Sequence, residues 1–344
     1  MISPKKFYMN NQMSNYKITV VIVTYGKRKN FLCESLNSVK DNFLVSDIIV
    51  VDNGSYEDIE TLCKPLYNSK IKFVKTGKNL GSAGGFYAGI KFAYEQGKGD
   101  FIFLLDDDNV VEVNCLENLI EHYIELGGDK NVCLKAFKYN KKGEVLYFKY
   151  NDTFDLKNSF FHFHLKSKIL YYIYKLLKKN KRDYALLPVK GVAYSGFFFN
   201  KYLVMKNGLP EKEMILYCDD TEYSLRFIKN GAKIFLCSNC KLKDLDVSWH
   251  HKKYNGNPFL SSGTNRIRSY YSIRNRVYVE KKYLVNSKIV YTLNFIIWIS
   301  YNLAKTLILD KNTKDVIKNF SFFLNAFKDG WNGKLGIKYY LEDL

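Results

Sequence analysis

Runs of apolar residues alternate with segments of helical spacing along the first 110 residues. Four of the runs are short and rich in β-branched side chains, which is typical of strands buried on both faces of a parallel sheet. The segments between them place apolar residues three and four positions apart, as in helices that cover one face of a sheet. We therefore predict strands at 17–25, 47–52, 71–75 and 100–105, and helices at 30–41, 56–67 and 86–97.

This alternation predicts an α/β fold: a Rossmann-like, doubly wound and mainly parallel sheet with right-handed crossovers. In an open sheet of this kind, ligands bind beyond the carboxyl ends of the strands. Tyr25, Asp52, the glycine-rich turn 79–85 and the acidic triplet 106–108 all lie at the carboxyl ends of predicted strands or follow them. The sequence thus places its polar motifs at the edge where such a fold holds a ligand.

The rest of the chain has a less regular pattern. It predicts a helix at 113–126, a strand with a glycine turn within 189–204, a helix at 221–230 and a mostly helical tail from 264. On this basis the chain divides into a leader at 1–16, an α/β domain at 17–262 and a helical C-terminal region at 263–344.

Three aspartates, Asp106, Asp107 and Asp108, end the fourth predicted strand. Adjacent carboxylates in a half-buried site repel one another unless a cation neutralises them, and carboxylate oxygens suit Mg²⁺ or Mn²⁺. The alternative is a solvated turn that caps the next helix, where Asp is also favoured. The position after a buried strand favours the metal site.

Two weaker motifs belong to the same expected edge. The turn 79–85 carries three glycines, whose backbone can approach a ligand, and the following helix offers N–H groups to a phosphate. The turn matches neither a P-loop nor the dinucleotide fingerprint, and a plain strand-to-helix turn explains it equally well. Asp52 could accept from a ribose hydroxyl or a base N–H, or form an ordinary Asx turn.

A second group of acids, Asp219, Asp220 and Glu222, lies just before or within the start of a predicted helix. Grouped carboxylates raise the pKa of at least one member, as a general base that deprotonates a hydroxyl requires. Capping of the helix dipole is the alternative. Trp249 and His250 follow; the indole could stack on a sugar and the imidazole could complete an oxygen-rich metal site, but alone the pair is a weak signal.

The composition is that of a folded, basic protein. Of 344 residues, 47% are hydrophobic, which excludes general disorder, and the net charge is +19. Such a charge suits nucleic acid, an anionic membrane surface or a phosphorylated substrate. The seven cysteines are irregularly spaced, which favours reduced thiols in the cytosol, and we see no signal peptide.

As an ordered set, these motifs resemble the family 2 glycosyltransferases, inverting enzymes with the GT-A fold. The resemblance covers roughly residues 17–280, and the set is far more specific than any one member. Within the family, the motifs are similar to the branch that transfers galactofuranose or rhamnose. The motifs that carry this finer resemblance are the glycine turn with Phe86, the triple Asp, the string 219–226, Trp249-His250 and the segment 271–276.

The resemblance implies a donor site and a metal site. Asp106 and Asp108 would be the pair that binds Mn²⁺ or Mg²⁺, with His250 as a further ligand. The nucleotide sugar would be held by Thr24, Tyr25, Asp52, Asn79, Gly84, Gly85 and Asp107.

It also implies an acceptor site and a mechanism. Asp220 aligns with the catalytic base, which would take the proton of an acceptor hydroxyl, and Asp219 and Trp249 would contact the acceptor. Glu222 replaces the Asp of the commoner form of this motif, which leaves the base position unaffected.

The expected donor is UDP-galactofuranose, with dTDP-rhamnose as the alternative. The expected acceptor is a glycan or lipid-linked glycan of cell-surface polysaccharide synthesis, which would place the protein in the cytoplasm at the inner membrane face. The segment 166–181 has the cation and aromatic content of an interfacial helix. Segment 289–309 contains Asn294, Asn302 and Lys305, so it predicts a peripheral or oligomer-packing helix rather than a membrane span.

Two other classes compete with this interpretation. A nucleotidyltransferase also pairs aspartates with Mg²⁺, but its glycine-rich signature would follow the first strand, where the chain has only Gly26, Lys27 and Arg28. A nucleic-acid-binding protein could stack bases on the abundant aromatics. No recognised binding motif is present and the acidic triplet would repel a nucleic acid, so we expect no such partner.

Overall fold

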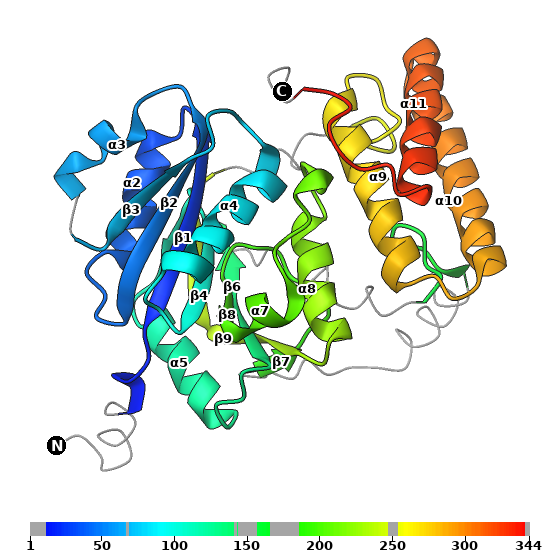
Figure 1. Ribbon diagram of the computed structural model, residues 1–344. Coiled ribbons are helices and arrows are strands. Elements are labelled where there is room, and N and C mark those ends of the chain that lie inside the picture. The colour runs from blue at the N-terminus through cyan, green and yellow to red at the C-terminus, as the bar shows by residue number, and fades with distance from the viewer. Residues whose placement is uncertain are drawn as a thin grey trace. The chain divides into compact units, whose positions relative to one another are not determined.

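The computed structural model describes residues 12–66, 69–140, 143, 157–165, 186–246 and 254–340. The chain forms two compact units, which we call the sheet unit and the helical unit (Figure 1). The expected boundary at 262/263 remains a prediction. The sheet unit comprises Met1–Asn151, Tyr184–Lys212 and Asp220–Val247, and the helical unit Asp152–Asp183, Glu213–Asp219 and Ser248–Leu344.

The four predicted strands form the parallel half of one sheet, in the order β3-β2-β1-β4. This confirms the expected α/β fold. Their bounds are β1 Ile18–Gly26, β2 Val45–Ser55, β3 Ile71–Lys75 and β4 Phe101–Asp106.

Beyond β4 the sheet becomes mixed. The next strand, β8, runs antiparallel to both β4 and β6, and β9 then pairs parallel with β6. Two short strands, β5 and β7, pair antiparallel with β9. The bounds are β5 Asn109–Val111, β6 Val132–Tyr139, β7 Leu186–Pro188, β8 Phe197–Asn200 and β9 Lys233–Asp244.

Helices cover both faces of the sheet, which is why its strands are apolar at successive positions. Val20 and Ile22 of β1 face one hydrophobic cluster, while Val21 and Val23 face the other. The first cluster lies under α2 (Lys29–Val39), α3 (Ile59–Leu62), the short 3₁₀ helix Lys64–Leu66 and α5 (Cys115–Glu125). The second lies under α4 (Gly81–Gln96), α7 (Tyr202–Asn207) and α8 (Asp219–Lys229).

Three sequence expectations need correction. Helix α4 begins at Gly81 instead of 86, so the glycines belong to its first turns. The expected strand within 189–204 is only β8, and the segment continues into α7. Helix α8 begins at Asp219 instead of 221, because the acids are favoured within a first helical turn.

Close packing explains the glycines of α4. A Cβ at Gly89 would lie 2.4 Å from Cγ1 of Val21 and 2.8 Å from Cγ2 of Val51. A Cβ at Gly85 would lie 2.6 Å from Cγ1 of Val23. The helix therefore reaches the ends of β1 and β2 only because these positions lack side chains.

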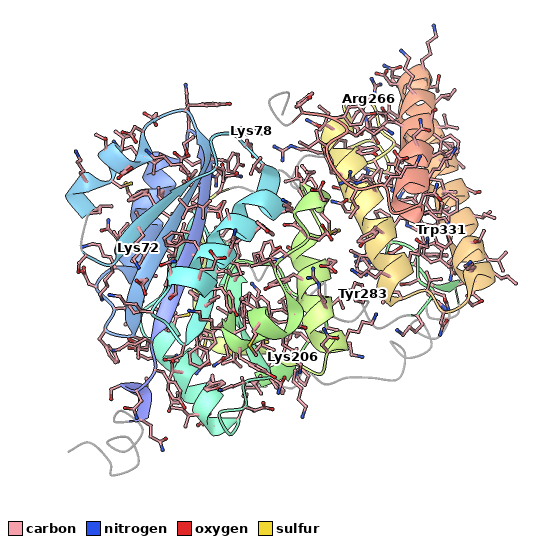
Figure 2. All side chains as sticks on the ribbon, viewed as in Figure 1. Lys72, Lys78, Lys206, Arg266, Tyr283 and Trp331 are labelled. Carbon is pink, nitrogen blue, oxygen red and sulfur yellow. The ribbon has the colours of Figure 1, made fainter. Side chains whose placement is uncertain are left out.

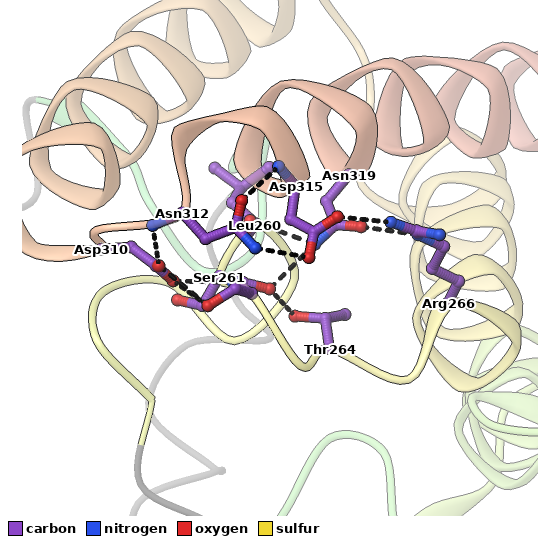
Figure 3. Close-up of polar contacts among 9 residues, drawn as sticks. Leu260, Ser261, Thr264, Arg266, Asp310, Asn312, Asp315 and Asn319 are labelled. Atoms are coloured by element: carbon purple, nitrogen blue, oxygen red, sulfur yellow. Dashed lines mark hydrogen bonds and ion pairs between the residues drawn. The ribbon is translucent and has the colours of Figure 1, made fainter.

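The helical unit confirms the predicted helical tail, with α9 (Arg266–Tyr283), α10 (Lys288–Leu309) and α11 (Thr313–Trp331). Helix α11 packs against both α9 and α10 around an aromatic core (Figure 1). Hydrogen bonds join the second turn of α11 to the start of α9: Nε of Arg266 donates to Oδ1 of Asn319 at 2.8 Å, and Asn319 donates to the carbonyl of Ser261 at 2.8 Å (Figure 3).

Candidate active site

The carboxyl ends of β1, β2 and β4 bring three predicted motifs together. In the sheet register, Thr24 lies beside Asp52 and Val23 beside Asp106. The motifs are therefore neighbours at one edge, as the strand-end rule predicts. Tyr25, the next residue of β1, is exposed there.

Asp107 points back into the protein. Its Oδ2 accepts a hydrogen bond from Oγ1 of Thr24 at 2.7 Å, and its Oδ1 accepts from Nε of Arg28 at 2.8 Å. The carboxyl group is buried, and burial raises its pKa to about 6 although Arg28 acts in the opposite direction. Both oxygens of Asp107 and the hydroxyl of Thr24 are thus engaged in holding the loop after β1 to the turn after β4.

Arg28 is a functional candidate that the sequence interpretation missed. Besides Asp107, its guanidinium contacts Oδ2 of Asp108 at 2.7 Å and Oδ2 of Asp246 at 2.9 Å. Attraction to Asp107 outweighs the cost of burial and raises the pKa of Arg28. The available signal was a lone arginine directly after the first strand, which only the fold brings to the acids.

Asp106 and Asp108 differ from Asp107 in their exposure. Both are partly exposed, and Asp106 makes no hydrogen bond or ion pair within the described part of the chain. Oδ1 of Asp108 accepts from Nδ2 of Asn109 at 2.9 Å. Burial, and then repulsion from Asp106, raises the pKa of Asp108 to about 7.

The chemistry of this pair fits a divalent cation. Mg²⁺ is commonly held by one or two carboxylates together with the phosphates of a substrate. Burial, and then repulsion from Asp106, raises the pKa of Asp108, and a cation bound beside both carboxylates would relieve that repulsion. Within the part of the chain that the structure describes, no three His, Cys, Asp or Glu side chains gather closely enough to hold a metal by themselves. His250, the expected further ligand, lies outside the described residues.

Two lysines of β6 face the acids, and neither was predicted. Nζ of Lys138 contacts Oδ2 of Asp244 at 3.0 Å, and attraction to Asp106, Asp108 and Asp244 outweighs burial and raises the pKa of Lys138. Lys135 is 1% exposed, and burial lowers its pKa to about 7. A lysine inside an apolar strand was the only sequence signal for it.

Asp220 shares the electrostatic environment of the metal-site candidates. Oδ1 accepts a 2.6 Å hydrogen bond from the backbone N–H of Thr221, while Oδ2 makes no hydrogen bond within the described residues. Burial raises the pKa of Asp220 to about 6; Asp106 adds to this rise, and Lys135 opposes it. The site thus contains a carboxylate with one free oxygen and a pKa suited to general base catalysis near neutral pH.

The candidate acceptor residues are placed only in part. Asp219 is buried at the first position of α8, directly before Asp220. Trp249 lies, like His250, outside the described residues.

The amide of Asn53, another residue the sequence interpretation passed over, joins β2 to the start of α4. Its Nδ2 donates to the carbonyl of Gly81 at 3.0 Å and its Oδ1 accepts from the N–H of Leu80 at 3.1 Å. A Cβ at Gly54 would lie 2.4 Å from the backbone nitrogen of Asn79, so only glycine permits this approach. Asn79, whose Oδ1 accepts from the N–H of Gly81 at 2.9 Å, is thereby held beside the end of β2.

Gly84 and Gly85 lie buried inside α4. Their missing side chains leave room for Leu80 and Val23, respectively. Oδ1 of Asp52 accepts a hydrogen bond from the backbone N–H of Ser55, three residues on, at 2.8 Å, and Asp52 remains partly exposed.

A strained turn precedes the acids of α8 in the chain. Ile215, Tyr217 and Cys218 have φ values of 67°, 69° and 60°, a left-handed conformation that is costly for side chains other than glycine. Nδ2 of Asn275, from the 271–276 motif, lies within hydrogen-bonding distance of three carbonyls of this turn. Those carbonyls belong to Met214, Leu216 and Tyr217.

The neighbouring Arg274 is fully buried and donates to the carbonyl of Met214 at 2.9 Å and to that of Gly336 at 2.6 Å. The sequence motif on α9 therefore holds a backbone conformation that local preference opposes.

The sheet with its helices and acidic edge has the GT-A fold of glycosyltransferases. Among solved structures, S. aureus TarS 1-349 is similar at a TM-score of 0.52 and 15% identity over 92% of this chain and 82% of that one. GalNAc-T7, solved with UDP, GalNAc and Mn²⁺, is similar at a TM-score of 0.51 and 15% identity over 77% of this chain. The match spans only 47% of the GalNAc-T7 chain. No curated protein sequence matches the chain.

The family model described as Glycosyl transferase family 2 matches residues 19–205, more than half of the chain. The chain therefore belongs to glycosyl transferase family 2, and it is an enzyme that transfers a sugar.

Proposed function

We propose that the protein is a metal-dependent, inverting galactofuranosyltransferase. It moves galactofuranose from UDP-galactofuranose to a hydroxyl of a glycan or lipid-linked glycan in cell-surface polysaccharide synthesis. The observation that carries the site assignment is the sheet register, which places Asp52 beside Thr24 and Asp106 beside Val23 at one edge. Repulsion from Asp106 also contributes to the raised pKa of Asp220, which supports assigning the base to the same site.

In the proposed reaction, Asp220 accepts the proton of the acceptor hydroxyl through its free Oδ2. The acceptor oxygen forms a bond to the anomeric carbon as the bond from that carbon to the diphosphate breaks, so the nucleoside diphosphate leaves with the bonding electrons. One carboxylate suffices because the sugar is displaced once, with inversion. Asp219 and Trp249 are assigned to the acceptor.

Asp106 and Asp108 would hold Mn²⁺ or Mg²⁺, with His250 as a further ligand. The cation would supply stabilisation of the charge that develops on the departing diphosphate. Arg28 and Lys138 keep the acid cluster from accumulating unpaired negative charge before that cation binds. The presence of UDP and Mn²⁺ with GalNAc-T7 supports a uridine donor and a divalent metal for this protein as well.

The donor nucleotide is assigned to the edge formed by Tyr25, Asp52 and Asn79. Thr24 and Asp107 support that edge through their mutual hydrogen bond. Gly85 lets α4 approach Val23 of the sheet and Gly84 leaves room for Leu80, so that Asn79 and the start of the helix would reach the donor. dTDP-rhamnose is the alternative donor, since the same motifs serve both sugars in the family.

The test is a donor panel with purified protein. Mn²⁺ or Mg²⁺ is supplied with UDP-galactofuranose, dTDP-rhamnose, UDP-galactose or UDP-glucose, and nucleoside diphosphate release is measured with and without a synthetic glycan acceptor. We expect metal-dependent turnover of UDP-galactofuranose, and a loss of about 10²–10⁴-fold in kcat for Asp220→Asn. Donor affinity by calorimetry should stay unchanged in that variant.

Asp41→Asn, which alters an exposed acid on the same unit, is the matched control and should keep full activity. If only dTDP-rhamnose were turned over, the donor would be dTDP-rhamnose in place of UDP-galactofuranose, and the assigned active-site residues would stand. Full activity of Asp220→Asn would remove Asp220 as the base.

We also propose that the enzyme works in the cytoplasm at the inner face of the cell membrane, where lipid-linked acceptors are found. The support is the net charge of +19, carried partly by exposed lysines such as Lys78 and Lys206 (Figure 2). The stretch 166–181 lies outside the described residues, so its membrane role stays a prediction.

A further inference from the structure

Helix α10 presents a long apolar surface to solvent. Ile289 is 76% exposed, Leu293 54% and Ile296 49%, and these residues follow one another at helical spacing. The same helix also exposes Val290, Ile297, Tyr301, Ile308 and Leu309. We call these eight residues the α10 face.

The buried side of α10 combines apolar side chains of the core with polar groups that contact the rest of the helical unit. Nδ2 of Asn294 donates to the carbonyl of Asn158 at 2.9 Å. Asn257 donates from its backbone N–H to Oγ1 of Thr306 at 3.0 Å and from Nδ2 to Oδ1 of Asn302 at 3.1 Å. The helix thus binds its own unit partly through amides and a hydroxyl while it turns aliphatic side chains outward.

A surface helix usually turns its apolar stripe inward and its polar side chains to water. Helix α10 departs from this pattern because it is apolar on both sides: Tyr291, Phe295 and Trp298 belong to the aromatic core, while aliphatic side chains face outward. Exposed apolar residues scattered singly are normal, but a continuous face of this length marks an interaction surface. Over its 22 residues the face extends about 33 Å.

The charges around the face are positive. Its ends and the start of α11 expose Lys288, Lys305, Lys311, Lys314 and Lys318. The two acids in this region are engaged by the protein: Asp310 is buried and accepts from Ser262 at 2.7 Å, and Asp315 faces Arg266 at 3.5 Å (Figure 3).

These charges favour one occupant. A second copy docked through the same face would bring lysine-flanked ends together, and like charges would oppose the contact. An anionic bilayer instead receives the aliphatic side chains among its acyl chains and the lysines among its phosphates.

Among the described residues, α10 is the one helix long and apolar enough to cross a membrane by length and composition. Its polar contacts with Asn158 and Asn257 hold it along the helical unit, which favours a helix lying flat in the interface.

We propose that the α10 face is a membrane-docking surface that inserts into the headgroup region of an anionic bilayer. This inference rests on the proposed location at the inner membrane face and names the surface that would contact the membrane. It would place the helical unit against the membrane and bring the enzyme close to lipid-linked acceptors.

The test is flotation of the full chain with phosphatidylcholine vesicles that contain or lack phosphatidylglycerol. We expect the protein to float only with the anionic vesicles, and added salt to weaken binding. The triple variant Ile289→Gln, Leu293→Gln and Ile296→Gln should lower the partition coefficient by about tenfold or more. The matched control, Met205→Gln with Val113→Gln, alters exposed apolar residues of the sheet unit and should bind as the natural protein does.

Light scattering and donor turnover complete the experiment. Equal vesicle binding by the triple variant and the natural chain would overturn the proposal. A dimer that the triple variant converts to a monomer, without vesicle binding, would also overturn it and assign the face to a second copy.

Turnover with a soluble acceptor and no vesicles should be equal in the natural chain and the triple variant. Failure of turnover in both, with vesicle binding intact, would count against the proposed reaction and leave the docking surface standing.

Discussion

The guanidinium of Arg28 donates from Nε to Oδ1 of Asp107 at 2.8 Å, and so joins the loop after β1 to the acidic turn after β4. The same guanidinium reaches Asp108 and Asp246. One side chain thus fixes the position of the middle aspartate and balances the charge of the third. The geometry explains how three successive carboxylates persist at the end of a buried strand.

Removal of this guanidinium should destabilise the fold. Arg28→Met leaves the buried Asp107 without its cation, and we expect the free energy of unfolding to fall by about 2–3 kcal/mol. The free energy of unfolding of Arg28→Lys should lie between that of the natural chain and that of Arg28→Met, because lysine keeps the positive charge but lacks the planar guanidinium. Urea unfolding measures the effect. The control is Lys27→Met at an exposed lysine, whose unfolding free energy should stay within about 0.5 kcal/mol of that of the natural chain. Equal stability of all variants would show that the ion pairs of Arg28 do not stabilise the fold.

The activity should rise with pH through the pKa of Asp220. A general base acts only when ionised, and burial raises the pKa of Asp220 to about 6, so kcat/KM should fall about tenfold per pH unit below 6 and level off above it. Lys135 favours the ionised form, so Lys135→Met should move the acid limb to higher pH. A pH–rate profile tests both statements. The control is Lys130→Met at an exposed lysine. If the acid limb of the pH–rate profile stayed in place in Lys135→Met, the interaction of Lys135 with Asp220 would be contradicted.

Metal binding should depend on Asp106. We expect chelation by EDTA to abolish transfer and Mn²⁺ to restore it. Asp106→Asn should weaken Mn²⁺ binding by more than about tenfold, since even outer-shell partners of metals contribute that much. Calorimetry with Mn²⁺ and the nucleoside diphosphate measures this directly. Asp41→Asn serves again as the control, and unchanged Mn²⁺ affinity in Asp106→Asn would exclude this residue as a ligand.

An added methyl group in α4 should disturb the sheet packing. Gly89→Ala places a Cβ 2.4 Å from Val21, and overpacking of this kind costs about 1–3 kcal/mol. The better helix propensity of alanine offsets up to about 1 kcal/mol of that cost. Thermal unfolding should show a lower Tm, whereas Lys91→Ala, on the exposed side of the same helix, should not. A Tm equal to that of the natural chain would mean that the helix can shift without cost.

Loss of the Asn275 amide should release the strained turn. Asn275→Ala removes the hydrogen bonds to the carbonyls of the 214–217 segment, and we expect a loss of about 2–4 kcal/mol in unfolding free energy. The turn runs directly into Asp219 and Asp220, so kcat should fall as well, even at temperatures where the variant is folded. Asn325→Ala, at an exposed position on α11, is the control. A stable variant with a normal kcat would show that the turn keeps its conformation without the amide.

Much of the fold follows from local pattern. The four β-branched runs became β1 to β4, because a strand buried on both faces must be apolar at successive positions. The helical tail was also predictable from its spacing. The antiparallel half of the sheet was not, since short strands such as β5 and β7 are selected by the partner that they pair with.

By itself, the sequence determined the family-defining motifs and their order, and placed Asp52 and the triplet 106–108 at one edge of the sheet. The fold alone shows that Asp107 turns inward to Thr24 and Arg28, and that Asp106 makes no hydrogen bond or ion pair among the residues that the structure describes. It also brought Lys135 and Lys138 to the acids and turned the aliphatic side of α10 outward. The order of hydrophobic and polar residues along the chain indicates whether a position is buried. A buried charge or polar atom, however, is stabilised by particular partners, and the fold brings those partners from distant parts of the chain.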